Sequence, residues 1–390
     1  MSTAKRRRLL MIEQGGRGGV TDYTAALVAA LAAEGWSVTL ATAADHRFPP
    51  LPGVRVVPVF HYVRGDTPLG RLVRARGLGR LANGLRFLAS LPRLALLAAR
   101  ADVVHTQGWE TPQIGVPAVI ALRLAGRPVV QTSHGMFDRA TTSRGARRTA
   151  RRLVARLTAR TIVHTQADLA YLPAQLAERT VVIPHGEYGG LARTGGAVDR
   201  DGARAELGLP GDAVVTLMFG QLRPDKGLPD LVAAVAAVPG LHLLIGGQDL
   251  GGLSEVRDSL PALAERVTVR EGFLDMRETA TMFAATDTVA LPYKEASQSG
   301  VLLLAYGFAR AVVVYPAGGM VEAVVDGETG WVCGAPDVPE LIAALADSVR
   351  AGRVECARRG EQGRLLAEER FAWPAIARRT AAVYEAVLDA

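Results

Sequence analysis

Cysteine, aromatic residues and long apolar runs are all scarce in this chain of 390 residues. The two cysteines, Cys333 and Cys356, are too few for a disulfide framework or a cysteine-rich metal site, and they fit a reducing compartment. No stretch approaches the roughly 18 uninterrupted apolar residues of a membrane-spanning helix. The apolar run Leu9–Ile12 is too short for the core of a signal peptide. We therefore expect a cytoplasmic protein.

Acidic residues are almost absent from two arginine-rich segments, although the formal net charge is only +7. Arg64–Arg100 carries eight arginines against one acid, Asp66, and Arg139–Arg160 carries eight arginines and no acid. Such segments form solvated helix faces, nucleic-acid surfaces or surfaces for anionic lipid and phosphate groups. Nucleic acid is disfavoured, because the interleaved aromatics that stack on single strands are missing. Solvated helices and peripheral contact with the inner membrane face both remain open.

The composition, 49% apolar and 21% charged, is that of a globular protein, and the length suggests two or three domains. Short β-branched runs alternate with helical patterns. The strands expected in the first half are Arg8–Glu13, Ser37–Thr42, Val54–Phe60, Asp102–Thr106, Pro128–Ser133, Thr161–Thr165 and Thr180–Pro184. Those expected in the second half are Val214–Phe219, His242–Ile245, Val267–Glu271, Thr288–Pro292 and Val312–Tyr315. Apolar runs separated by helices indicate parallel sheets covered on both sides. The sequence therefore predicts an α/β fold with two Rossmann-like domains.

The break between the two series falls in Glu187–Gly202, which is rich in glycine and lacks periodicity. We interpret 187–202 as a linker between a first domain, 1–186, and a second domain, 203–370. Three further helices are expected near the end: Pro339–Val349, Ala357–Glu368 and Trp373–Leu388. Ligands of doubly wound sheets bind at the carboxyl ends of the strands, so the polar loops there are the candidate sites.

The first such loop, Gly15–Gly19, follows the first strand and opens a helix. Its glycines, Gly16, Gly18 and Gly19, allow a tight turn and close approach of a ligand, and the helix start favours an anion. The nicotinamide-cofactor pattern lacks its third glycine, and the second strand ends without a ribose-binding carboxylate. A dehydrogenase is therefore disfavoured, while a simple tight turn remains an alternative.

The second loop contains Arg223 and Lys226, three residues apart after strand Val214–Phe219. The planar guanidinium fits phosphate oxygens, and the ammonium adds a point charge. The pair could hold a diphosphate, or be two solvated cations on a surface turn.

The third loop follows strand Thr288–Pro292 and precedes an apolar helix. Its candidate binding residues are Glu295, Ser297, Gln298, Ser299, Gly300 and Val301. Hydroxyls, an amide and free backbone N–H groups suit sugar hydroxyls or a phosphate, although one serine could simply cap the helix. We expect the three loops, from two domains, to define one cleft.

His134 follows strand Pro128–Ser133 on the same side, which favours a functional role for it. His105, His164 and His185 also follow strands but belong to different β–α units. No H-E-x-x-H spacing or G-x-S-x-G elbow occurs, so we expect neither a metal site nor a serine hydrolase.

These residues resemble the retaining glycosyltransferases of family 4, which have the two-domain GT-B fold. Gly15–Gly19 looks like the family's glycine loop, SHGMFD places His134 at its active-site histidine, and FGQLRPDKGLPDL looks like its diphosphate-binding loop. The most specific match is PYKEASQSGVLLLAYGFARAVVVYPAGGMVEAVVDGETGWVC. Phe371–Leu388 resembles the family's last helix, so the resemblance implies that 371–390 crosses back to the first domain.

The sequence departs from the family at one point. Many members carry two glutamates, eight positions apart, near the donor sugar and the ribose. Aligned on Gly300, those positions hold Ser297 and Ala305, and Glu295 lies two residues early. The nature of the donor and of the ribose contact is therefore open.

The resemblance implies an enzyme that moves a hexosyl unit from a nucleotide-diphosphate sugar to an acceptor hydroxyl without metal or cofactor. His134, Arg223 and Lys226 would be catalytic. The acceptor would be a glycan, a lipid-linked sugar or a small molecule, in polysaccharide, glycolipid or natural-product synthesis. Two alternatives remain: a sugar-nucleotide epimerase, using Glu13, Asp138 or Glu295 as acid and base, and a non-catalytic sugar-nucleotide binder.

Overall fold

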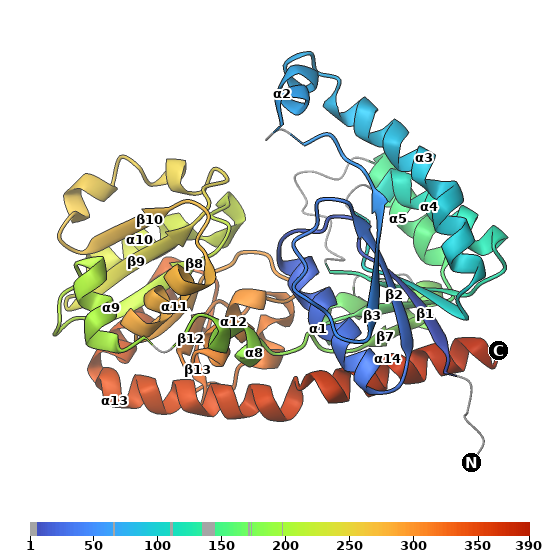
Figure 1. Ribbon diagram of the computed structural model, residues 1–390. Coiled ribbons are helices and arrows are strands. Elements are labelled where there is room, and N and C mark those ends of the chain that lie inside the picture. Colours follow the sequence, from blue (N-terminus) through green and yellow to red (C-terminus); the bar gives the residue numbers. More distant parts are fainter. Residues whose placement is uncertain are drawn as a thin grey trace. The chain divides into compact units, whose positions relative to one another are not determined.

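The computed structural model describes residues 6–64, 67–109, 112–134, 145–170, 172, 174–196 and 198–390. The chain divides into two compact units (Figure 1). Unit 1 comprises Met1–Gly186 and Trp373–Ala390, and unit 2 comprises Glu187–Ala372. Each contains a parallel sheet between helices, so the predicted α/β fold with two Rossmann-like domains is confirmed.

The sheet of unit 1 has the strand order β3-β2-β1-β4-β5-β6-β7. Its strands are β1 (Arg8–Ile12), β2 (Ser37–Ala43), β3 (Val54–Phe60), β4 (Val103–Thr106), β5 (Val129–Thr132), β6 (Arg160–Val163) and β7 (Thr180–Val182). Its helices are α1 (Gly19–Ala33), α2 (Pro68–Ala75), α3 (Gly79–Ala99), α4 (Pro112–Leu124), α5 (Gly145–Leu157), α6 (Gln166–Ala170), α7 (Ala174–Ala177) and α14 (Trp373–Leu388).

Side chains that alternate along β1 build two cores in unit 1. Leu9 and Met11 pack with α1 and α14 on one face of the sheet. Leu10 and Ile12 pack with α3 and α4 on the other face (Figure 1). This arrangement explains why the strands of a buried parallel sheet read as continuous apolar runs.

The sheet of unit 2 has the strand order β10-β9-β8-β11-β12-β13. Its strands are β8 (Val214–Phe219), β9 (Leu241–Gly247), β10 (Val267–Glu271), β11 (Thr288–Leu291), β12 (Ala311–Val314) and β13 (Gly330–Val332). Its helices are α8 (Gly189–Thr194), α9 (Arg200–Leu207), α10 (Leu228–Ala237), α11 (Met276–Ala285), α12 (Gly300–Gly307) and α13 (Val338–Arg370). Helices α9, α11 and α12 pack on one face of the sheet, and α10 and the first half of α13 on the other.

One interpretation of unit 2 needs correction, and a second is confirmed. The segment 187–202 is not a bare linker, because it belongs to unit 2, contains α8 and begins α9. The two helices expected at 339–349 and 357–368 are confirmed, because α13 consists of two helices that meet at a kink at Gly352 (φ 74°, ψ 174°). In the first case burial of α8 against α11 and α12 outweighs the poor helix propensity of its glycines.

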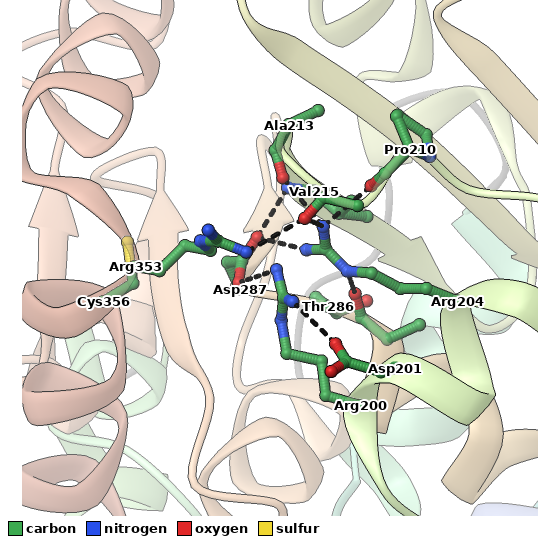
Figure 2. Close-up of polar contacts among 12 residues, drawn as sticks. Arg200, Asp201, Arg204, Pro210, Ala213, Val215, Thr286, Asp287, Arg353 and Cys356 are labelled. Atoms are coloured by element: carbon green, nitrogen blue, oxygen red, sulfur yellow. Dashed lines mark hydrogen bonds and ion pairs between the residues drawn. The ribbon is translucent and has the colours of Figure 1, made fainter.

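A buried ion pair fastens α9 to the amino-terminal edge of the sheet in unit 2 (Figure 2). The side chains of Arg204 and Asp287 are 2% and 6% exposed, and Nη2 donates to Oδ2 at 2.6 Å. Asp287 Oδ2 also accepts the backbone N–H of Val215 at 2.8 Å. Arg204 donates further to the backbone carbonyls of Pro210, Ala213 and Ala285, each at 2.9 Å. The buried charges therefore satisfy each other and the backbone around them, as burial requires.

Candidate functional sites at the carboxyl ends of the two sheets

The glycine loop of unit 1 is organised by a buried carboxylate. Glu13 accepts the backbone N–H groups of Gly15 and Gly16 at 2.9 and 2.7 Å, and the hydroxyl of Thr42 at 3.2 Å. Gly16 has φ +67°, and a Cβ there would lie 2.9 Å from His46 Cα, so the turn needs glycine. Glu13 therefore has a structural role, and the amides of Gly15 and Gly16 are occupied rather than presented to an anion.

The open part of the same loop lies at the start of α1. Gly18 has φ +87° and caps the helix without a side-chain hydrogen bond. A Cβ at Gly18 or Gly19 would meet no described atom within 4 Å. The structure thus leaves space at this helix start, where the backbone N–H groups favour anionic or polar ligand groups.

Four histidines gather beside this loop because neighbouring parallel strands end at one edge of the sheet. The ring of Tyr23, on α1, makes edge contacts with the rings of His134 and His164, at centroid distances of 4.8 and 5.3 Å, and a tilted contact with His185 at 4.8 Å. His105 contacts the hydroxyls of Thr132 and Tyr384. The sequence had assigned these histidines to separate β–α units; the order of the predicted strands could have brought them together.

His134 is held by polar contacts on both ring nitrogens. Its Nδ1 lies 3.2 Å from His164 Nε2, and its Nε2 lies 2.9 Å from the Gln107 carboxamide. Residues 135–138 of the same loop, including Asp138, lie outside the described residues.

Burial keeps the histidine cluster neutral. It lowers the pKa of His105 and of His185 to about 3, and it lowers the pKa of His164 as well. Burial, together with the neighbouring imidazoles, also holds the pKa of His134 well below its ordinary value. Within the described ranges, no group of three or more histidine, cysteine or acidic side chains could hold a metal ion.

In unit 2, Arg223 and Lys226 lie in the loop after β8. The Arg223 guanidinium donates to both carboxylate oxygens of Asp225, at 3.0 and 3.3 Å, and to Gln221 Oε1 at 3.0 Å. Lys226 Nζ lies 3.5 Å from the centre of the Tyr293 ring, a cation–π contact with the residue that begins the next loop. Both cations are therefore held in place at the strand ends.

The loop after β11 is fastened to the Arg223 loop. The Lys294 backbone N–H donates to the carbonyl of Asp225 at 3.2 Å. Gly227 adopts φ +71°, and a Cβ there would lie 2.0 Å from the carbonyl oxygen of Pro292, so the close approach requires glycine. The structure thus brings the second and third predicted loops together within unit 2.

Residues of the third loop have different surroundings. Ser299 caps α12, accepting the Leu302 N–H at 3.2 Å, which confirms the capping alternative for this serine. Gln298 Oε1 is buried without a hydrogen-bond partner among the described residues. Glu295 is exposed, and Ser297 is partly buried. A buried amide oxygen without a partner can accept from a ligand, and Gln14 Oε1 and Gln131 Oε1 are in the same condition among the described residues.

The remaining candidate positions, Gly300, Val301 and Ala305, belong to α12. Gly300 and Val301 begin this helix, and a Cβ at Gly300 would lie 3.3 Å from the Tyr188 ring. Ala305 is fully buried in the core of unit 2. Its side chain therefore faces the core, and any ribose carboxylate must come from another position.

Two doubly wound sheets with polar loops at their carboxyl ends are the architecture of the GT-B fold, and comparisons with known proteins identify the family. A family model described as "Glycosyl transferase 4-like domain" matches residues 18–186, and one described as "Glycosyl transferases group 1" matches residues 213–351. The chain belongs to the family 4 glycosyltransferases with the GT-B fold. It is a glycosyltransferase.

Curated relatives agree with this assignment. The D-inositol 3-phosphate glycosyltransferase of Actinosynnema mirum is 30% identical over 348 residues, which cover 81% of this chain and 80% of that protein. The enzyme of the same name from Segniliparus rotundus is 31% identical, with 75% and 67% covered. For the Mycobacterium avium enzyme of that name, the match spans 61% of its length.

A solved structure shares the fold at lower identity. Anabaena HepE in complex with UDP-glucose has a TM-score of 0.73 and 22% identity, covering 97% of this chain and 99% of that one.

Proposed function

We propose that this glycosyltransferase moves a hexosyl unit from a nucleotide-diphosphate sugar to an acceptor hydroxyl and retains the anomeric configuration. The observation that carries the proposal is the pair Arg223 and Lys226, which are fixed at a sheet edge where such folds bind ligands. The UDP-glucose bound to Anabaena HepE supports a donor of this class. The unpartnered Gln298 Oε1 supports a hydroxyl-bearing ligand beside them.

In the proposed reaction, the bond between the anomeric carbon and the diphosphate oxygen breaks. The acceptor oxygen bonds to the same face of the sugar, and its proton passes to the departing diphosphate. Arg223 and Lys226 stabilise the negative charge that develops on the leaving group, a role that prearranged cations perform without reorganisation. For this, Arg223 exchanges part of its contact with Asp225 for phosphate oxygens. His134 contacts the donor sugar.

The acceptor class is a glycan, a lipid-linked sugar or a small molecule. The names of the curated relatives make a phosphorylated inositol the first acceptor to test.

We expect the donor to be identified by the increase in protein stability that its binding causes. Among GDP-mannose, UDP-glucose and UDP-N-acetylglucosamine, at least one should raise the unfolding temperature, since a ligand at 100 times its Kd adds about 2.7 kcal/mol. The same donor should then be transferred, or slowly hydrolysed, in the presence of EDTA. NMR of the product should show the donor's anomeric configuration. Inversion, an epimerised sugar, binding without turnover, or activity lost to EDTA and restored by Mn²⁺ would each contradict part of the proposal.

Helix α3 of unit 1 carries apolar residues on two opposite faces. Phe87, Leu94 and Ala98 are buried against the sheet. The opposite face exposes Leu81 (60%), Leu85 (59%) and Leu88 (45%), at four- and three-residue spacing, and Leu96 (67%) eight residues further on. An amphipathic helix that packs on a sheet needs only one apolar face. The fold therefore does not explain the exposed leucines on the opposite face of α3.

Arginines line one flank of the exposed stripe. Arg86, Arg93 and Arg100 follow each other at seven-residue intervals and are exposed. In the part of the chain that is described, none of the three has an acidic partner, although Arg86 donates to the backbone carbonyl of His61 at 3.2 Å. None of the described helices is long and apolar enough to cross a membrane. We also propose that this face of α3 lies on the anionic inner face of a membrane, with its leucines in the interface and its arginines on lipid phosphates.

Sedimentation with liposomes tests the membrane proposal. The protein should bind vesicles containing phosphatidylglycerol but not neutral phosphatidylcholine vesicles, and binding should weaken above about 0.1 M salt, where charges are screened beyond roughly 10 Å. The double variant Leu81→Ser/Leu85→Ser should bind at least about tenfold more weakly, because burial of each leucine contributes about 1.5–3 kcal/mol. Val354→Ser, at an 86% exposed position of unit 2, is the control and should bind like the wild type. Unchanged vesicle binding of the double variant would show that this face of α3 does not contact the membrane.

A further inference from the structure

The hydrogen bonds around His134 form a continuous chain through His164 to the backbone. His164 Nδ1 lies 3.0 Å from the carbonyl oxygen of Ile183, at the end of β7. A carbonyl oxygen can only accept, so Nδ1 carries the proton of His164. His164 is buried, and burial lowers its pKa, so the ring is neutral and its Nε2 carries a lone pair.

This lone pair determines the protonation of the next ring. His164 Nε2 lies 3.2 Å from His134 Nδ1, and two nitrogens at this distance form a hydrogen bond only if one carries a proton. His134 Nδ1 must therefore be the donor. A neutral His134 is then the Nδ1–H tautomer, with a lone pair on Nε2.

The other side of His134 sets a condition on this tautomer. Its Nε2 lies 2.9 Å from Gln107 Oε1, and Gln107 Nε2 lies 3.0 Å from Met11 Sδ. A 180° flip of the carboxamide exchanges its oxygen and its nitrogen. A neutral His134 requires the amide nitrogen of Gln107 to face Nε2 and to donate. Tyr23 makes edge contacts with both imidazole rings, and a flip of either ring would replace a hydrogen-bonding nitrogen with a carbon.

We propose that His164 is a positioning residue for the transfer reaction: by accepting from His134 Nδ1–H, it fixes the tautomer whose Nε2 lone pair receives a hydroxyl of the donor sugar. The proposal rests on the function proposed above. When the donor binds, Nε2 exchanges the amide of Gln107 for the sugar hydroxyl, and the ring keeps its orientation because Ile183 and His164 hold the opposite side. In any neutral histidine, the hydrogen bond made by one ring nitrogen determines whether the other ring nitrogen carries a proton or a lone pair.

Two substitutions at His164 separate the two hydrogen bonds. His164→Gln places an amide oxygen near the position of Nε2, so it keeps an acceptor for His134 and loses the donor to Ile183. His164→Asn places its amide near the position of Nδ1, so it keeps a donor to Ile183 and loses the acceptor for His134. The two variants introduce the same functional group and differ by one methylene, which makes each the control for the other.

Kinetics and nitrogen NMR test the proposal together. Histidine-selective ¹⁵N spectra, assigned with His134→Gln, should show the Nδ1–H tautomer of His134 in the wild type and in His164→Gln, and a mixture or the Nε2–H tautomer in His164→Asn. With the preferred donor, His164→Asn should lower kcat at least about tenfold, which corresponds to the loss of one hydrogen bond, whereas His164→Gln should stay within about threefold. Circular dichroism checks that both variants fold.

Each outcome bears on the proposal. An Nε2–H tautomer of His134 in the wild type would overturn it, and so would a His164→Asn variant as active as His164→Gln. The spectra do not depend on turnover. A wild-type protein that shows the Nδ1–H tautomer but transfers no sugar would contradict the proposed function and leave the hydrogen-bond assignment standing.

Discussion

Replacing Arg223 or Lys226 with alanine should lower kcat/KM for sugar transfer by about 30-fold to 900-fold. The reason is that a prearranged donor to a developing charge contributes roughly 2–4 kcal/mol in the transition state. Arg223→Lys should restore little of the loss, because the guanidinium offers two parallel donors to phosphate oxygens and the ammonium does not. Steady-state kinetics with the preferred donor measure the effect.

Arg350→Ala is the matched control for the Arg223 variant. Arg350 belongs to unit 2 and is paired with a carboxylate on its own helix, but its side chain is 72% exposed. The control should keep wild-type kinetics, because exposed pairs contribute little. If Arg223→Ala and Lys226→Ala both match the control, the leaving diphosphate does not bind this loop and the proposed function fails.

Removal of the Asp287 carboxylate should cost the most stability, about 3–5 kcal/mol of the free energy of unfolding of unit 2. Asp287→Ala leaves the Arg204 guanidinium charged and buried, and it also removes the acceptor of the Val215 N–H. Hydrogen exchange of amides in β8 and β11 measures the change locally, so the stability of unit 1 does not enter.

Asp201→Ala provides the control for the Asp287 variant. Asp201 also pairs with an arginine, Arg200, but its side chain is 93% exposed. Its removal should change the free energy by no more than about 1 kcal/mol. Equal protection in the two variants would show that the buried pair contributes no more than a surface pair.

Much of the fold could be predicted because strands in buried parallel sheets are continuous apolar runs. Val54–Phe60, Val214–Phe219 and Val267–Glu271 were predicted to the residue. The short strand β13 and helix α8 were missed, since both begin with glycine and owe their structure to tertiary contacts. Local propensity carries no signal of such contacts.

The candidate site was predicted in part, for a similar reason. The positions of Arg223 and Lys226 after a strand followed from local pattern. The hydrogen bonds between His134, His164 and Gln107 did not, because they join residues 27 and 30 positions apart in the chain. The partner of Arg204, 83 positions away, was equally invisible in the sequence. Glu13, which the sequence offered only as an acid or base for the epimerase alternative, accepts backbone N–H groups of its own loop, and nothing in the sequence indicated these contacts.

Unit 1 is built from two stretches of chain, and this has a consequence for synthesis on the ribosome. Its sheet can form once Gly186 has emerged, but Ile376 and Tyr384 of α14 complete its core, and the Tyr384 hydroxyl contacts His105. At about 5–20 residues per second, the roughly 200 intervening residues take about 10–40 s to translate. During that interval the face of the nascent sheet later covered by α14 stays open to chaperones. Unit 2, which is continuous in sequence, can finish folding before the unit whose translation began first.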